Sequence, residues 1–179
     1  MEVFGHYGYE GTSMQLLLGG LGIARQSLYD TYGNKRDLFL KAVKHYVDEK
    51  SSDVVTYLAV MVPVKQAITD IFDVVGETLR DEQRRKECFI LSSAIDRIPH
   101  DPEIAELFAQ DKVRLEEALY EALVRGQEQG EFSISRDMRA LARYLYYARY
   151  GLTQAAKLTE DPLVIEQITT VTLSVVEQE

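Results

Sequence analysis

Three consecutive residues, Arg25, Gln26 and Ser27, have side chains that can read DNA bases. Arginine forms two hydrogen bonds with guanine, glutamine forms two with adenine, and serine can either donate or accept. The three residues lie in "ARQSLYDTYGNKRDLF" (residues 24–39), and the apolar Leu28 follows them directly. The pattern indicates a short helix that presents polar side chains to base edges. An exposed polar helix face is the simpler alternative.

Hydroxyl and amino groups around this stretch are suited to the phosphates of the DNA backbone. Tyr29, Thr31 and Lys35 follow the base-reading residues, and Thr12 and Ser13 begin an earlier short helix whose first N–H groups are free. Groups of this kind bind phosphate and fix the position of a protein on DNA without selecting its sequence. We therefore expect all five residues to position the protein on a duplex.

Two short helices are needed to hold these side chains. The first, "TSMQLLL" (residues 12–18), ends in "GGLG", and the second, "ARQSLYDTY" (residues 24–32), is closed by Gly33 and the asparagine after it. Leu28 faces inward and locks the second helix to the first. This arrangement fits a helix-turn-helix, in which the N-terminal residues of the second helix enter the major groove.

The remaining chain is predicted to be helical, because apolar residues recur at three- and four-residue spacing and no stretch alternates as a strand does. The fold class is therefore all-α, with a small helix-turn-helix head at 1–46 and a larger body at 47–179. "RDEQRRKE" (residues 80–87) is predicted to be a solvated loop. The predicted helices are a glycine-broken tail at 2–11, the two short helices, a long helix from Asn34 or Lys35 to about Tyr57, one starting near Pro63, "CFILSSAIDRI", one from Pro102 to "GQEQGEF", 135–159, and Pro162 to about Val176.

Charge divides the chain in the same way. The formal net charge is −9. Residues 1–50 hold six basic and six acidic side chains, whereas the remainder holds 14 basic and 23 acidic ones. An acidic body repels DNA everywhere except where the neutral head is presented. The overall charge therefore excludes general nucleic-acid affinity and leaves a local binding surface possible.

Composition also indicates the cellular compartment in which the protein is expected. The longest apolar run, "VVTYLAVMVPV" (residues 54–64), is shorter than the roughly 18 residues that a membrane span needs. Cys88 is the single cysteine, which gives no disulfide framework, and we recognise no signal peptide. We therefore expect a cytoplasmic protein with no membrane partner.

Neither catalysis nor a fixed metal or cofactor is expected. The three histidines, His6, His45 and His100, are isolated from one another and from carboxylate pairs at ligand spacing. "GGLG" (residues 19–22) has no preceding strand and no Gly-Lys-Ser/Thr ending, so it does not predict a nucleotide site. Cys88 beside Phe89 is interpreted first as a small buried residue.

The segment "GYEGTSMQLLLGGLGIARQSLYDTYGNKRDLFLKAVKHY" closely resembles the DNA-binding head of the TetR/AcrR family of bacterial transcriptional regulators. Weaker similarity continues into the body through "PHDPEIAELF", "RGQEQGEF" and "RALARYLYYARYGL". The resemblance implies a homodimer that binds a palindromic operator in double-stranded DNA, represses transcription and releases DNA when a small-molecule effector enters the body. It implies a four-helix dimer interface from 135–159 and 162–176.

The sequence departs from the family pattern in the head. Members normally have a full first helix preceded by a basic arm, whereas this chain starts at what would be the last turns of that helix. We therefore expect an incomplete first helix and weaker DNA binding. Gly19 and Gly20 stand where helix-forming residues are common, and each costs about 1 kcal/mol against alanine if helical.

An effector site in the body is implied by the family, and its residues are predicted from aromatic and small polar side chains. Such residues can line a mostly apolar cavity, although a core or a dimer interface would use them equally well. Their character favours a hydrophobic effector over a highly charged one. The predicted set is Tyr57, Phe72, Cys88, Phe89, Ser92, Phe108, Tyr146 and Tyr147.

Three hypotheses follow for the function. The first is a ligand-responsive regulator, in which an effector prefers the form with wrongly spaced heads and the helix from Asn34 to about Tyr57 transmits the change. The second is a dimeric small-molecule-binding protein whose head does not bind DNA. The third is an enzyme built in the helical body, which would need clustered titratable groups in the cavity.

Overall fold

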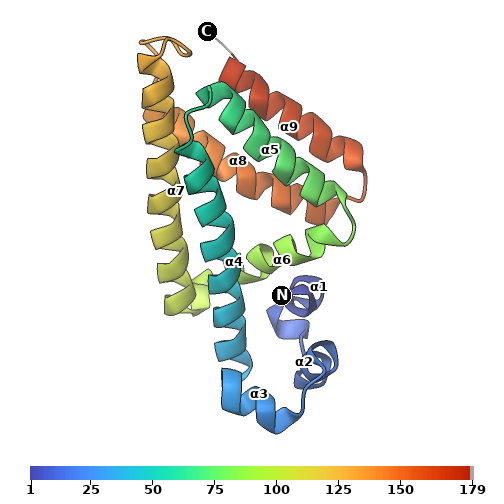
Figure 1. Cartoon of the computed structure of the whole chain (residues 1–179). Helices are drawn as coiled ribbons and strands as arrows, with labels where there is room; N and C mark the ends of the chain where they lie inside the picture. The colour runs from blue at the N-terminus through green and yellow to red at the C-terminus, as the bar shows by residue number, and fades with distance from the viewer. Residues whose placement is uncertain (178–179) are drawn as a thin grey trace.

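The computed structural model describes residues 1–177, and every regular element in that range is a helix (Figure 1). A small head contains α1, α2, α3 and the start of α4, and the remaining helices form the body. The elements are α1 (Glu2–Gly11), α2 (Met14–Leu21), α3 (Arg25–Tyr32), α4 (Lys35–Leu58), α5 (Val64–Arg80), α6 (Arg84–Ile95), the short 3-10 helix η1 (Ile98–His100), α7 (Pro102–Glu128), α8 (Met138–Leu158) and α9 (Pro162–Glu177).

The two predicted short helices are present, and the first is longer than expected. The Ser13 hydroxyl caps α2 by accepting a hydrogen bond from the Leu16 N–H at 3.2 Å. The helix continues through Gly19 and Gly20 and ends only at Gly22, whose left-handed backbone (φ 65°) suits glycine. The helix ends within "GGLG" as predicted, but its last helical residue is Leu21 rather than Leu18, because only the last glycine takes a helix-ending conformation.

Aromatic side chains form the core of the head. Phe4 and Phe39 are almost completely buried, and their ring centroids are 4.9 Å apart. Tyr9 lies 4.8 Å from Phe39, and Leu28 of α3 is fully buried in the same cluster. α1 interrupts its helical geometry at Gly8. The aromatic contacts join α1 to the start of α4, and α3 packs against α4.

α4 connects the head with the body as one helix of 24 residues. It begins at a capping box, in which the Asn34 side chain accepts from the N–H of Asp37, and the Asp37 carboxylate accepts from the N–H of Asn34. The Arg36 guanidinium then donates to both carboxylate oxygens of Asp101 at 2.8 Å and to Glu103 at 2.8 Å. The same α4 therefore carries head residues and pairs with the start of α7.

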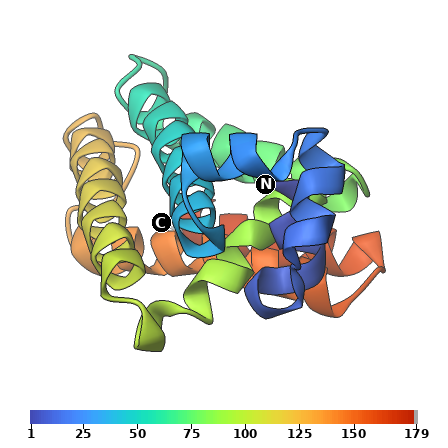
Figure 2. The ribbon, with the colours of Figure 1, turned by 90° about the horizontal axis from the view of Figure 1, so that it is seen from below.

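The body places α4 beside α7 and packs α5, α8 and α9 together (Figure 1). Asp101 caps α7 and Pro102 occupies its first turn, as predicted. Asp137 caps α8 by accepting from the Ala140 N–H at 2.9 Å, so this helix begins at Met138 rather than at residue 135. The head lies at one end of the body (Figure 1), so it is in front of the body when the molecule is seen from below (Figure 2).

The segment 80–87 is not the solvated loop that was predicted. Asp81 accepts hydrogen bonds from the N–H groups of Gln83 and Arg84, both at 2.9 Å, and α6 starts at Arg84. An exposed carboxylate at this position satisfies N–H groups at the start of the helix. Residues 84–87 are therefore helical, and only 81–83 form a turn between α5 and α6.

α6 also contacts the head, through α1. Gly5 of α1 packs so closely on α6 that an added Cβ would lie 2.0 Å from the Lys86 carbonyl oxygen. Deeper in the same contact, the Ser93 hydroxyl donates to the Phe4 carbonyl at 3.2 Å. The head is thus joined to the body through both α4 and α6.

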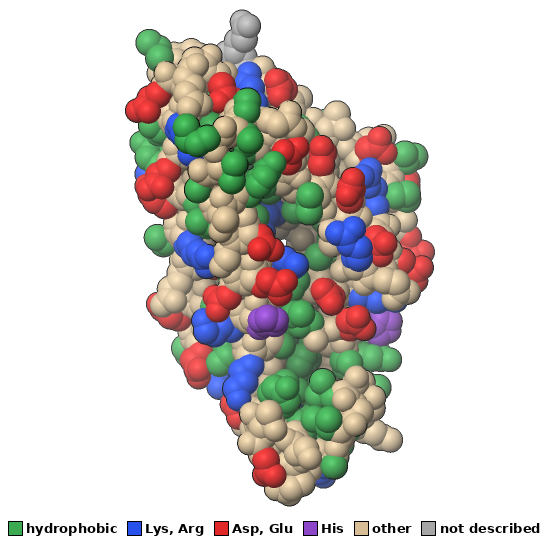
Figure 3. Space-filling model, viewed as in Figure 1, with side chains coloured by type: hydrophobic (Ala, Val, Ile, Leu, Met, Phe, Trp, Pro, Cys, Tyr) green, Lys and Arg blue, Asp and Glu red, His purple; other side chains and the backbone are tan. Residues whose placement is uncertain are grey.

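The surface differs between the two parts. On the face in Figure 3, acidic and basic side chains are interspersed over the body, and the end that holds the head shows few charged side chains. Among the described residues, no helix combines the length and the apolar character that crossing a membrane requires.

Candidate DNA-binding surface and cavity

α3 presents its polar side chains on the outside of the head. Arg25, Gln26 and Ser27 form its first turn and are exposed, whereas Leu28 is fully buried behind them. The Gln26 amide donates to the Asp30 carboxylate at 2.8 Å, so one of its donors is already occupied. The arrangement brings the three predicted base-reading residues together at the accessible N-terminal end of a helix.

The predicted phosphate-binding residues differ from one another in their exposure to solvent. Tyr29, Thr31 and Ser13 are exposed, and the Lys35 ammonium lies 4.5 Å from the centre of the Tyr9 ring. Thr12 is buried, and its hydroxyl donates to the Gly8 carbonyl at 2.6 Å. The prediction for the Thr12 side chain is therefore wrong, because that hydroxyl closes the turn after α1 instead of facing solvent.

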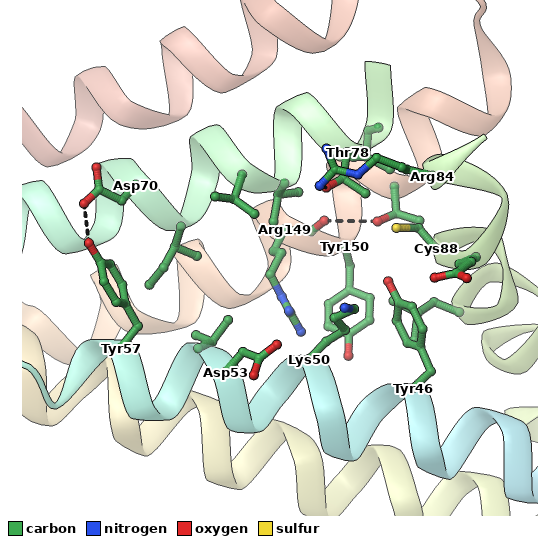
Figure 4. Close-up of a pocket in the computed structure, with 18 residues that line it drawn as sticks. Tyr46, Lys50, Asp53, Tyr57, Asp70, Thr78, Arg84, Cys88, Arg149 and Tyr150 are labelled. Carbon is green, nitrogen blue, oxygen red and sulfur yellow. Dashed lines mark hydrogen bonds between the residues drawn. The ribbon is translucent and has the colours of Figure 1, made fainter. Parts of the chain in front are cut away.

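The body contains a cavity of about 580 Å³ between α4, α5, α6 and α8 (Figure 4). Its volume is in the usual range for small-molecule sites. Aliphatic side chains cover the α5 side, and tyrosines and charged residues project from α4, α6 and α8. The lining residues are Tyr46, Lys50, Asp53, Val54, Tyr57, Asp70, Ile71, Val74, Val75, Thr78, Leu79, Arg84, Glu87, Cys88, Leu91, Arg149, Tyr150 and Thr153.

Two of the eight predicted ligand residues, Tyr57 and Cys88, line this cavity. The other six do not line it: Phe108 lies on α7, which contributes nothing to the lining, and the other five lie on different faces of α5, α6 and α8. Phe72, Ser92, Phe108 and Tyr146 are buried in the core, Phe89 is half-buried, and Tyr147 is 56% exposed.

The cavity residues that the prediction missed have a signal in the sequence. Tyr46, Lys50, Asp53 and Tyr57 recur at three- and four-residue spacing and so share one face of α4. This polar and aromatic stripe marks the face of α4 that lines the cavity. No comparable pattern in the sequence singles out Arg149.

Tyr46 and Cys88 form one end of the cavity (Figure 4). Burial raises the pKa of the Tyr46 phenol, and the Cys88 thiol that hydrogen-bonds with it raises that pKa further. Burial also raises the pKa of Cys88, although Lys50 and Arg149 act in the opposite direction. Both groups are therefore neutral at pH 7, and Cys88 is not an activated thiolate.

Tyr57 and Asp70 close the opposite end (Figure 4). The Tyr57 hydroxyl donates to Asp70 at 2.5 Å, and the Gln66 amide donates to the other carboxylate oxygen at 2.7 Å. The hydrogen bond from Tyr57 is the main cause of a lowered pKa at Asp70. This carboxylate is thus ionised and already holds two donors.

A buried carboxylate lies behind the cavity wall and joins three helices. Asp111 of α7 is 5% exposed and accepts hydrogen bonds from Ser51 of α4 at 2.5 Å and from Tyr150 of α8 at 3.1 Å. Burial raises the pKa of Tyr150. A change in the position of Tyr150 within the cavity would therefore affect α4 through the hydrogen bonds that Asp111 accepts from Tyr150 and Ser51.

A helix-turn-helix head that shares a continuous helix with a cavity-bearing helical body defines a DNA-binding regulator with a ligand-binding domain. Residues 1–42 match the family described as bacterial regulatory proteins, tetR family, and residues 65–172 match the tetracyclin repressor-like C-terminal domain. The chain is 52% identical over 178 residues to the uncharacterized HTH-type transcriptional regulator YezE of Bacillus subtilis (strain 168), covering 99% of this chain and 92% of that protein. The chain belongs to the tetR family of transcriptional regulators, which are not enzymes.

Solved structures share the fold. The regulator CifR in complex with a 26-base-pair operator DNA has a TM-score of 0.81 and 21% identity, covering 97% of this chain and 91% of that one. A transcriptional regulator from Saccharomonospora viridis in complex with choline has a TM-score of 0.84 and 17% identity, covering 99% and 91%. Both similarities extend over the head and the body.

Proposed function

We propose that the chain is a homodimeric repressor in the cytoplasm, which binds a palindromic operator and leaves it when a small effector enters the cavity. The observation that carries this proposal is the continuity of α4. Its first turns pack in the head that holds α3, and its later turns supply Tyr46, Lys50 and Tyr57 to the cavity wall. One helix thus belongs to both sites and offers a physical route for coupling between them.

In this proposal residues 1–46 act as the DNA-binding unit and residues 47–179 bind the effector and the second subunit. The first turn of α3 enters the major groove, where Arg25 and Gln26 read bases and Tyr29, Thr31 and Lys35 contact phosphates. The operator complex of the structurally similar CifR supports this use of the fold. Two heads must lie about 34–36 Å apart, or a multiple of that distance, to occupy successive turns of one DNA face.

The proposed dimer interface uses the outer faces of α8 and α9. In a chain with 27% charged residues, each of these helices has an exposed stripe without a charge, as is common at the centre of an interface. The α8 stripe is Ala140, Tyr144, Tyr147, Gly151 and Leu158, and the α9 stripe is Leu163, Gln167, Thr170, Val171 and Ser174.

Release follows from a preference of the effector for one of two forms. An effector that fills the cavity and holds α4 away from its DNA-bound position lowers operator affinity by its differential affinity for the two forms. The Asp111 hydrogen bonds from Tyr150 and Ser51 give a direct connection between cavity and helix. The aliphatic α5 wall supports an effector with a substantial apolar part.

The proposal is tested by selecting binding sites from a randomised duplex pool at about 150 mM salt, because protein–DNA affinity depends on salt. We expect enrichment of one palindrome. Arg25→Ala should then weaken binding by about 1–3 kcal/mol and relax selection at one base pair of each half-site. Lys44→Ala is the matched control, because Lys44 lies on α4 and pairs with Asp48 at 2.8 Å away from α3.

Each outcome separates the hypotheses. Enrichment that depends on Arg25 and not on Lys44 supports the regulator. If no palindrome is enriched while small molecules still bind the cavity, the chain is a dimeric small-molecule-binding protein whose head does not bind DNA.

A further inference from the structure

Arg149 is a cation on the cavity wall whose guanidinium has no acceptor among residues 1–177. The other two lining cations are engaged: Lys50 pairs with Glu49 at 3.3 Å, and Arg84 donates to the Thr78 hydroxyl at 3.1 Å. The described contact of the Arg149 guanidinium is with the neighbouring Tyr150 ring, at 5.5 Å. Figure 4 shows the Arg149 side chain extending across the cavity toward α4.

The carboxylates nearby do not supply this missing acceptor. Asp70 holds Tyr57 and a glutamine amide, and Asp111 holds two hydroxyl groups. Asp53 is exposed and Glu87 is half-buried on α6, and among the described residues no ion pair joins either of them to Arg149. The guanidinium therefore offers five N–H donors to the cavity without a described partner.

A half-buried guanidinium without an acceptor loses part of its hydration, and the contact with the Tyr150 ring replaces none of the lost hydrogen bonds. A bound carboxylate would restore two parallel hydrogen bonds to it, the strongest arrangement available to arginine. Lys50 lies on the facing helix α4, so a second positive charge borders the same space (Figure 4). Although Asp53, Asp70 and Glu87 also line the cavity, the unpaired donors of Arg149 favour an anionic group of the ligand at this point.

The opposite wall has a different requirement. Ile71, Val74, Val75 and Leu79 of α5 line the cavity with aliphatic side chains, and Val54 of α4 adds to them. Apolar groups of a ligand would be removed from water here at a gain of about 25 cal/mol per Å². A ligand that satisfies both walls has one anionic group and an apolar remainder.

We propose that the effector is an amphipathic monoanion of the carboxylate type, whose anionic group binds Arg149 and whose apolar part lies against α5. The inference rests on the proposed function, in which the cavity binds the effector, and it adds the sign of the charge that the effector carries. It distinguishes this chain from the structurally similar regulator that holds choline, a cation.

Three probes with one carbon skeleton test the proposal: 4-phenylbutyrate, 4-phenylbutanol and 4-phenylbutylamine, with choline as a fourth ligand. Binding to the full chain is measured by isothermal titration calorimetry. We expect the carboxylate to bind at least about tenfold more tightly than the alcohol, as one charge-assisted pair provides, and the amine and choline to bind more weakly still.

Substitutions then locate the anion. Arg149→Met should remove the preference for the carboxylate over the alcohol, and Lys50→Met should reduce it less, because Lys50 already pairs with Glu49. Arg143→Met is the matched control on the same helix, since Arg143 is 63% exposed and absent from the cavity lining. Circular dichroism of each variant checks that the helices are retained.

Tighter binding of the amine or of choline overturns the proposal, as does a preference for the carboxylate that survives Arg149→Met. Failure of the carboxylate to bind at millimolar concentration also overturns it. Operator selection without any probe is a separate measurement, so loss of the regulator proposal and loss of this one are distinguishable.

Discussion

Arg36 and Asp101 join the start of α4 to the start of α7 through a two-pronged ion pair. The Asp101 side chain is 2% exposed, and the hydrogen bond from Arg36 is the main cause of its lowered pKa. A carboxyl group whose pKa is lower in the folded chain stabilises the fold above its unfolded pKa of about 3.9. That contribution is lost as the pH falls through the lower folded pKa.

We therefore expect the midpoint temperature of thermal unfolding to decrease as the pH falls below about 4. Arg36→Met should make this decrease smaller, because it removes the acid-dependent part of the stability that the ion pair provides. Arg36→Met should also lower the midpoint at pH 7, because it leaves the buried Asp101 carboxylate without its main donor. Circular dichroism melts between acid and neutral pH measure both effects. An unchanged pH profile in Arg36→Met would show that other carboxyl groups control acid unfolding.

At the same scale, the two candidate sites differ in how far the sequence predicts them. Arg25, Gln26 and Ser27 are exposed on α3 as expected, because a short helix with one buried residue, Leu28, leaves its other faces outside. The cavity residues depend on how four helices, distant in the chain, pack against one another. The aromatic character of Phe72 or Phe108 carries no information about that packing, and so most of the predicted ligand residues were misplaced.

At the scale of elements, α1 and α6 meet at Gly5, and this contact tolerates no side chain. An added Cβ at Gly5 would lie 2.0 Å from the Lys86 carbonyl oxygen, which belongs to the backbone and cannot rotate away. We expect Gly5→Ala to push the two helices apart and to lower the free energy of unfolding by about 1–3 kcal/mol. Chemical denaturation measures this change.

Gly19 provides the matched control for that substitution. It is an exposed glycine within α2, and an added Cβ would meet nothing within 4 Å. Gly19→Ala should therefore raise the free energy of unfolding by about 0.5–1 kcal/mol through helix propensity alone. If both substitutions changed stability in the same direction, the close approach of α1 to α6 would be refuted as the cause.

Two helix starts were predicted well because their caps are local in sequence. Asn34 before α4 and Asp101 with Pro102 before α7 are caps that the sequence displays directly. The start of α6 was missed because the run of charges after Arg80 resembles a loop, although Asp81 satisfies the first N–H groups of the helix. Side-chain type alone does not separate a solvated loop from the exposed first turn of a helix.

At the scale of the whole molecule, the proposed dimer predicts a concentration-dependent mass. Val171 on the outer stripe of α9 is 64% exposed, and Val113 on α7 is 68% exposed. We expect Val171→Glu to place a charge in the interface and to shift the chain toward monomer in analytical ultracentrifugation. Val113→Glu adds the same charge outside the interface and should leave the dimer intact; dimers that persist in both variants would move the interface to other helices.

The single helix α4, from Lys35 to Leu58, has a consequence for the operator as well as for the effector. In the proposed mechanism the coupling between the two binding sites is reciprocal, so operator DNA lowers the affinity of the cavity for the effector by the same factor by which the effector lowers the affinity for DNA. Chromosomal sites thus compete for the regulator against the effector. A cell with more copies of the operator would need more effector to reach the same degree of release, which makes the response threshold a property of the genome as well as of the protein.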